Sequence, residues 1–180
     1  MTLSGNRQLI LHRNHDDVEI QEINGGAFMT SREVDGLLKK GRAYASRTKY
    51  KEAIAYFDKA LSLDPANPEA LNFRAGVFIE TGRNTEALAD CEHAIALNQN
   101  FADAWAKKGR TLYNLEQFED AVVACTRALA LNGNDAYAWY IKGVCLDELG
   151  RNDEAGEAYG KSLELEIILD MEAEKRKVGR

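Results

Sequence analysis

The sequence predicts an all-α protein in which four helical hairpins stack into a solenoid, with a C-terminal capping helix and an N-terminal leader outside the repeat. Three observations predict this fold. The chain matches itself when the segments that begin at Val34, Pro68, Ala102 and Ala136 are aligned. Within each matching segment the apolar residues recur at helical spacing. Turn-forming residues interrupt that spacing midway through three of the four segments, at 46–49, 82–83 and 150–151, which indicates two helices per segment.

Columns of small and large residues define the repeat. Three columns are small in every copy: Gly41, Ala75, Gly109 and Gly143; Ala53, Ala87, Ala121 and Ala155; Ala60, Ala94, Ala128 and Ser162. Two helices approach closely only where one presents a small side chain, so these columns mark contacts between helices. Large apolar columns fill the space around the contacts: Leu37, Leu71, Trp105 and Trp139; Leu61, Ile95, Leu129 and Leu163.

The phase of these columns places the hairpins within residues 30–165. Asn67 before Pro68 predicts an N-cap followed by proline at the first helical position. Asn100 and Asn134 are predicted to cap the first helices of the third and fourth copies. We therefore expect eight helices in four repeats, which span residues 34–67, 68–101, 102–135 and 136–165.

Residues 166–180 are predicted to form a C-terminal capping helix and tail. No turn residues follow Leu165, so the helix is expected to continue or to restart there. The last hairpin of a solenoid leaves one apolar face open, and a terminal helix with a polar outer side closes it. Ile167, Ile168 and Met171 are therefore expected to face the core.

Residues 1–29 form a leader that does not follow the repeat. Two segments rich in β-forming residues, 8–13 and 18–23, flank the turn-like residues 14–17. An isolated β-hairpin is marginally stable in water. The leader is therefore interpreted either as disordered or as a small β-hairpin.

Composition and charge exclude several classes of partner. The formal net charge is −6, from 23 basic and 29 acidic side chains. Binding to phosphate backbones requires a basic footprint, so no nucleic-acid partner is predicted. No apolar run approaches the ~20 residues of a membrane helix, so no membrane partner is predicted either. The three cysteines form neither a CxxC pair nor a secreted disulfide framework, which favours a cytoplasmic location.

No residue pattern points to catalysis, a cofactor or a metal. His12 and His15 are three positions apart, but no second ligand pair accompanies them. Cys91 and Cys125 occupy one packing column, which is typical of small apolar filler residues. The glycines are scattered and form no phosphate-binding loop. We therefore predict a protein that is not an enzyme, with no catalytic residue, no metal site and no cofactor.

The repeat resembles the tetratricopeptide signature. Its first copy carries nearly all signature positions, which are Leu37, Gly41, Tyr44, Ala53, Phe57, Ala60 and Pro65. Later copies depart from the signature: the aromatic column becomes Cys91 and Cys125, and the proline column becomes Gln99, Gly133 and Ile167. The resemblance covers residues 34–165. It implies a right-handed superhelical solenoid.

In this family the first helices of successive repeats line a concave groove that holds an extended or helical peptide of a partner protein. The resemblance implies a groove here that mixes cations with aromatic residues: Leu38, Arg42, Asn72, Phe73, Lys107, Arg110, Tyr113, Tyr137 and Tyr140. Such a surface suits a peptide with a carboxylate or acidic side chain and one or two apolar anchors. Lys107 and Arg110 are equally compatible with solvated helix positions.

One subtype of the family, found in co-chaperones, holds a C-terminal carboxylate with Lys, Asn, Asn, Lys and Arg on three successive first helices. The matching positions here hold Leu38, Arg42, Phe73, Asp103 and Lys107. Only Lys107 keeps the charge type in register. The resemblance therefore does not extend to that clamp.

The predicted function is a scaffold for protein–protein interaction, which binds a peptide or helix of another protein in the groove. Two alternatives stay open. The first is a self-associating structural protein that forms homo-oligomers through the groove, the end cap or the leader. The second is the recognition module of a larger enzyme or regulatory protein.

Overall fold

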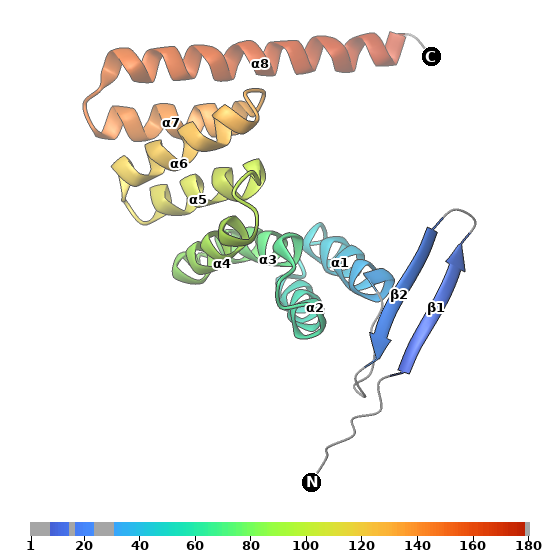
Figure 1. Ribbon diagram of the computed structural model, residues 1–180. Coiled ribbons are helices and arrows are strands. Elements are labelled where there is room, and N and C mark those ends of the chain that lie inside the picture. Colours follow the sequence, from blue (N-terminus) through green and yellow to red (C-terminus); the bar gives the residue numbers. More distant parts are fainter. Residues whose placement is uncertain (1–7, 15–16, 24–30, 179–180) are drawn as a thin grey trace.

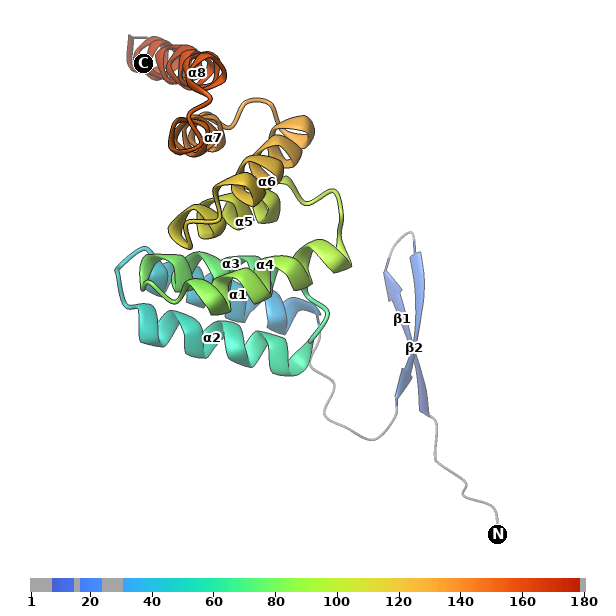
Figure 2. The ribbon, with the colours of Figure 1, turned by 90° about the vertical axis from the view of Figure 1, so that its left-hand side faces the viewer.

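The computed structural model describes residues 8–14, 17–23 and 31–178 (Figure 1). Eight helices lie in the described part of the chain: α1 (Ser31–Ala45), α2 (Tyr50–Leu63), α3 (Pro68–Glu80), α4 (Asn84–Leu97), α5 (Ala102–Asn114), α6 (Phe118–Leu131), α7 (Ala136–Glu148) and α8 (Asn152–Val178). Consecutive helices pair into four hairpins that stack along the molecule (Figures 1 and 2). The predicted all-α repeat fold is confirmed.

The helix starts keep the period that the sequence predicts. Helices α3, α5 and α7 begin at Pro68, Ala102 and Ala136, the same three positions at which the repeats were placed. The connections inside the hairpins also repeat, with a residue of positive φ at Thr48, Gly82, Glu116 and Gly150. Glycine adopts this left-handed conformation at little cost, whereas Thr48 and Glu116 adopt it against the preference of their side chains.

The small columns lie where the prediction places them, at the contacts inside each hairpin. A Cβ added to Gly41 would lie 2.5 Å from Cε1 of Phe57, and one added to Gly143 would lie 2.7 Å from Cε1 of Tyr159. In these hairpins a small residue on the first helix therefore leaves room for a larger one on the second. Ala53, Ala87 and Ala121 are fully buried.

The N-caps differ from the prediction in two repeats. Asn67 caps α3 as expected, and its Oδ1 accepts a hydrogen bond of 2.9 Å from the Ala70 amide. Helix α7 is instead capped by Asp135, whose carboxylate accepts from the Ala138 amide. The prediction of Asn134 is wrong because its own amide donates to the Asn132 side chain, which delays the helix by one residue. Asn100 makes the matching bond to Asn98, and Phe101 occupies the N-cap of α5 without a side-chain bond.

Within the leader, β1 (Gln8–Asn14) and β2 (Asp17–Ile23) pair as an antiparallel two-stranded sheet. The register pairs Gln8 with Ile23 at one end and Asn14 with Asp17 at the other. Residues 1–7, 15–16 and 24–30 lie outside the described residues.

The C-terminal segment is helical, but it is one helix with the second half of the fourth repeat. Helix α8 runs without interruption from Asn152 to Val178 and extends past the end of α7 (Figure 1). The expectation that Ile167, Ile168 and Met171 face the core is wrong, because their exposed fractions are 51%, 45% and 55%. The straight continuation of α8 carries these side chains beyond α7, so no described helix lies beside them.

Among the described residues, none of the helices is both long and apolar enough to cross a membrane.

The three cysteines are core residues with raised pKa values. Cys91, Cys125 and Cys145 are fully buried and free. Burial raises the pKa of the Cys91 and Cys125 thiols to about 12 and that of Cys145 to about 11. The thiolate is the reactive form of cysteine. Burial therefore keeps reagents away from these thiols, and it also disfavours the nucleophilic thiolate.

We expect all three thiols to be unreactive in the native protein. With a pKa of about 12, about 10⁻⁴ of the Cys91 and Cys125 thiols is ionised at pH 8, and with a pKa of about 11 about 10⁻³ of Cys145 is. Titration with a chromogenic disulfide at pH 8 should detect none of the three at first, and all three after addition of denaturant. Free cysteine at equal concentration is the control. A thiol in the native protein that reacts at the rate of that control contradicts the prediction.

Candidate functional site

The first cluster of predicted groove residues joins α1 to α3. Arg42 is exposed, and its Cζ lies 5.0 Å from the centre of the Phe73 ring, within the range of a cation–π interaction. Phe73 in turn stacks on Phe57 of α2, with 5.9 Å between ring centres. Among the described residues, Arg42 has no carboxylate in ion-pair contact. Arg42 therefore presents an exposed cation beside an aromatic ring at this end of the predicted groove.

Two predicted groove residues are buried instead of exposed. Leu38 is 5% exposed and packs in the core cluster with Val34 and Phe57. Asn72 is 1% exposed. In this arrangement Leu38 offers no contact surface to a ligand, and Asn72 acts by positioning its neighbours.

Asn72 belongs to a polar network between α3 and α5. Its Nδ2 donates to Oδ2 of Asp103 at 2.6 Å, and Lys107 Nζ donates to the same oxygen at 2.6 Å. Burial acts to raise the pKa of Asp103, but the charge and hydrogen bond of Lys107, with the bond from Asn72, hold it below its usual value. Asn72 Oδ1 is buried without a hydrogen-bond partner among the described residues. Asp103 therefore neutralises the Lys107 ammonium within the protein.

A second ion pair crosses the same face, from α5 to α3, and its arginine also reaches α7. Arg110 Nη1 donates to Oε1 of Glu80 at 2.8 Å, and the Arg110 Cζ lies 5.6 Å from the centre of the Tyr137 ring. Burial raises the pKa of Tyr137. Arg110, like Lys107, is thus matched by a carboxylate of the protein and is not an isolated cation.

Tyrosines continue this face at the C-terminal end. Tyr137 and Tyr140 are 50% and 48% exposed, and their ring centres are 6.4 Å apart. The Tyr140 ring lies 6.0 Å from that of Tyr159 on α8. Burial, together with the hydrogen bond that its hydroxyl donates to Asp147, raises the pKa of Tyr159 to about 12. Tyr113 turns toward α6 and packs on Phe118, with ring centres 6.2 Å apart.

Most of the predicted residues lie on the first helices of the hairpins and are here called the first-helix face, although Leu38 lies beneath it and Tyr113 at its margin. Its members are Arg42, Phe73, Lys107, Arg110, Tyr137 and Tyr140. Asp103, also a predicted groove position, belongs to this surface, and two residues outside the prediction complete it: Glu80 and Tyr159. Tyr159 occupies the same repeat position as Phe57, and this aromatic column could have indicated from the sequence that Tyr159 packs beside the first helices. No signal marks Glu80, because its contact with Arg110 joins different columns of two repeats.

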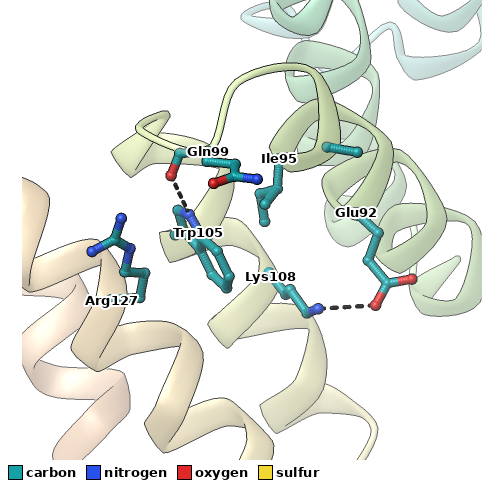
Figure 3. Close-up of a pocket in the computed structure, with 7 residues that line it drawn as sticks. Glu92, Ile95, Gln99, Trp105, Lys108 and Arg127 are labelled. Atoms are coloured by element: carbon teal, nitrogen blue, oxygen red, sulfur yellow. Dashed lines mark hydrogen bonds and ion pairs between the residues drawn. The ribbon is translucent and has the colours of Figure 1, made fainter.

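A pocket of about 420 Å³ lies elsewhere, between α4, α5 and α6 (Figure 3). Its walls include Trp105, whose Nε1 donates to the Gln99 carbonyl at 3.0 Å, and the ion pair of Lys108 with Glu92 at 2.9 Å. Arg127 reaches the same pocket from α6. None of its lining residues belongs to the first-helix face.

A family model for the tetratricopeptide repeat matches residues 38–104 and 106–165, which is more than half of the chain. The chain is a tetratricopeptide repeat protein. The expected family is thereby confirmed, and the four hairpins described above are tetratricopeptide repeats.

Curated relatives match the repeats of this tetratricopeptide protein. RNA polymerase II-associated protein 3 of Rattus norvegicus is 33% identical over 107 residues, which are 58% of this chain and 16% of that protein. The heat-shock protein cognate co-chaperone sgt12 of Aspergillus fumigatus is 31% identical over 101 residues, which are 56% of this chain and 29% of that protein. The chain thus spans less than a third of the length of either relative.

Solved structures share the arrangement of the hairpins. A crystal structure of MamA has a TM-score of 0.69 at 26% identity and covers 77% of this chain and 81% of that chain. The first tetratricopeptide domain of Spaghetti (RPAP3), solved with the HSP90 peptide SRMEEVD, has a TM-score of 0.66 at 29% identity. It covers 69% of this chain and 99% of that chain. One structural relative of this tetratricopeptide protein is therefore a peptide-binding domain.

Proposed function

We propose that this tetratricopeptide repeat protein is a non-enzymatic scaffold, which binds a short peptide segment of another protein on its first-helix face. The observation that carries the proposal is a pair of cation–aromatic groups on successive first helices: Arg42 with Phe73 on α1 and α3, and Arg110 with Tyr137 on α5 and α7, with Tyr140 beside Tyr137. A structural relative that binds a peptide supports the same use of the fold. A cytoplasmic location, as the cysteines suggest, belongs to this proposal.

The chemistry of the face specifies the peptide. Arg42 supplies a cation without a carboxylate partner among the described residues, beside the apolar Phe73 ring. Tyr137 and Tyr140 supply half-exposed aromatic rings at the other end. Arg and aromatic residues dominate the binding energy of protein interfaces. The favoured ligand carries an acidic group for Arg42 and an apolar or aromatic anchor for the tyrosines.

The length of the peptide follows from the number of first helices that it crosses. Neighbouring packed helices lie about 8–10 Å apart, so the four first helices extend over roughly 30 Å. An extended chain covers about 3.3 Å per residue, which corresponds to roughly nine residues. A peptide of this length can reach both ends of the face.

The carboxylate clamp of co-chaperone repeats is not the proposed mode of binding. Leu38 occupies one clamp position and is buried, while Asp103 occupies another and already pairs with Lys107. An acidic ligand at Lys107 must therefore compete with an internal carboxylate. This competition favours Arg42 as the residue that binds the acidic group of the ligand.

Selection from a displayed library of 12-residue peptides tests the proposal. We expect the immobilised protein to enrich peptides that combine a carboxylate with an aromatic or apolar residue. In fluorescence polarisation, Arg42→Glu and Tyr140→Ala should each weaken the enriched peptides by about tenfold or more. Both side chains are exposed, so neither change should lower the melting temperature appreciably.

The matched control is Lys59→Glu, which makes the same charge change on the second helix α2. Lys59 is exposed and lies outside the first-helix face. It should leave the affinity unchanged. Failure to enrich any peptide, or equal affinity of wild type and Arg42→Glu, would overturn the proposal. Reversal of Lys107 or Arg110 is a poorer test, because it sets a new carboxylate beside Asp103 or Glu80.

A second candidate is the recognition module of a larger enzyme or regulatory protein. It is favoured by the curated relatives, in which the matching segment makes up 16% and 29% of the length. The two candidates share the binding face and differ in what that face is attached to. A reading frame longer than this chain at its natural locus decides between them.

A further inference from the structure

The last helix carries an apolar stripe that no other described part of the chain covers. Helix α8 has 27 residues, against 13 to 15 in the other described helices. Every residue from Glu166 to Lys177 is exposed, and this part of α8 extends past α7 (Figure 1). A helical stretch as short as this exposed part is only marginally stable in water without tertiary contacts, so packing on another surface stabilises it.

The repeat itself indicates which face of α8 lacks a partner. In the second repeat, Ile95 is 9% exposed because Ala104 and Trp105 of the next first helix pack against it. Leu163 stands in the same column of the fourth repeat, and it is 58% exposed. Among the described residues no fifth hairpin follows. The open face of α8 is therefore the face that each earlier repeat buries against its successor.

Five residues form the open stripe: Gly156, Gly160, Leu163, Ile167 and Met171. They follow at intervals of three and four positions, which places them on one side of the helix. Leu163, Ile167 and Met171 are each more than half exposed. A Cβ added to either glycine would meet nothing within 4 Å, so the backbone of another helix can approach closely there.

The stripe points away from the rest of the molecule. Helix α8 contacts α7 through a different side, on which Ala155, Ala158 and Ser162 are buried. The Ser162 hydroxyl donates to the Ala136 carbonyl of α7 at 2.8 Å. At about 100° per residue, Ile167 lies well over a quarter of a turn from this contact side. A second helix can thus lie along the stripe without meeting α7.

Charges beside the stripe point to the occupant. Glu157 and Lys175 are separated by a whole number of helical turns, about five, so they lie on the same edge of the stripe. Both are exposed, and neither has an ion-pair partner among the described residues. The midpoint between them is Glu166. It is adjacent to Ile167, the central one of the three large apolar residues of the stripe. Two antiparallel copies of α8 that cross at this point therefore pair Glu157 with Lys175 twice.

We propose that the chain forms a two-fold symmetric dimer through antiparallel pairing of α8. In this pairing Ile167 of one copy faces Ile167 of the other, and Leu163 faces Met171. Glu157 of each copy lies toward the basic end of the partner at Lys175, and the helix dipoles oppose each other. A parallel pair would instead set the basic ends side by side. The isologous contact closes on itself, so the assembly stops at two copies.

The experiment is sedimentation equilibrium of the full chain over a concentration range up to about 0.5 mM. We expect the wild-type mass to rise with concentration from that of one chain toward that of two. Ile167→Glu should weaken the dimer by at least about a hundredfold, because it places two carboxylates at the centre of an apolar contact. Leu169→Glu is the matched control, since Leu169 is 54% exposed but lies on the opposite side of α8. It should leave the dimer intact.

A charge swap tests the direction of pairing. Glu157→Lys and Lys175→Glu should each weaken the dimer, and the double variant should restore it, because both charges then change sign together. A wild-type chain that keeps the mass of one copy throughout the range overturns the proposal. So does a dimer that responds equally to Ile167→Glu and Leu169→Glu, or a double variant weaker than both single variants. The inference is independent of the peptide-binding proposal, because the first-helix face contributes none of these residues.

Discussion

Replacement of Arg74 by leucine is expected to lower the free energy of unfolding by about 3–5 kcal/mol, because it leaves Asp90 as an uncompensated buried carboxylate. Arg74 on α3 donates from Nε and Nη2 to both carboxylate oxygens of Asp90 on α4, at 2.8 and 2.7 Å. Asp90 is 6% exposed. A third bond, of 2.6 Å from Nη1 to Asp58, joins α3 to α2 of the preceding repeat. Urea unfolding followed by far-ultraviolet circular dichroism measures the loss.

The repeat supplies the control for this prediction. Lys108 occupies the position of Arg74 one repeat later, and its Nζ lies 2.9 Å from Oε1 of Glu92, which is 54% exposed. Because an exposed carboxylate regains its hydration when its partner is removed, Lys108→Leu should cost no more than about 1 kcal/mol. Addition of Asp90→Ala should recover much of the stability of Arg74→Leu, since the matching positions hold Ala124 and Ala158. Equal losses at Arg74 and Lys108 would contradict the argument.

Replacement of Gly41 by alanine is expected to destabilise the first hairpin, although alanine is the better helix former. The new Cβ would lie 2.5 Å from Cε1 of Phe57, and the Phe57 ring is 1% exposed and cannot withdraw. Overpacking of this kind costs about 1–3 kcal/mol. It acts against a gain in helix propensity of up to about 1 kcal/mol. A net fall in the urea midpoint is the expected result.

Two variants separate overpacking from helix propensity. Gly36 lies on the same helix α1, and a Cβ added there meets nothing within 4 Å. Gly36→Ala should therefore stabilise the protein by about 0.5–1 kcal/mol. Combining Gly41→Ala with Phe57→Cys reproduces the pairing of Ala75 with Cys91 in the second repeat. The double variant should be more stable than the sum of the single changes predicts, and strict additivity would refute the proposed contact.

The sequence was sufficient for the parts of the fold that recur in every repeat. Helix starts at Pro68, Ala102 and Ala136, and the close contacts of Gly41 and Gly143, follow from columns that four copies repeat. Because four copies share each column, a departure in one copy does not obscure the pattern. The pattern predicts the ends of helices less well, because a single hydrogen bond to the Asn132 side chain moves an N-cap from the predicted position to the next residue.

The candidate site was predictable as a set of positions and less so as a set of charges. The spacing predicts contacts between neighbouring first helices, and the structure places Arg42 beside Phe73 and Arg110 beside Tyr137. It does not reveal that Arg110 already pairs with Glu80, because that contact joins two repeats across 30 residues. Nor does it distinguish Leu38, which is buried, from Arg42 one turn later, which is exposed.

The repeat period, the helix pairs and the residues at which helices touch follow from the sequence alone, because each of these depends on spacing within a copy. The pairing of polar groups and the point at which packing stops depend on how the helices are arranged in space. Arg74 finds its buried partner in Asp90, although the other repeats hold Tyr56, Ala124 and Ala158 in that column. Leu163 stays exposed although its column is buried elsewhere, since burial requires a neighbouring helix and the described chain supplies none after α8.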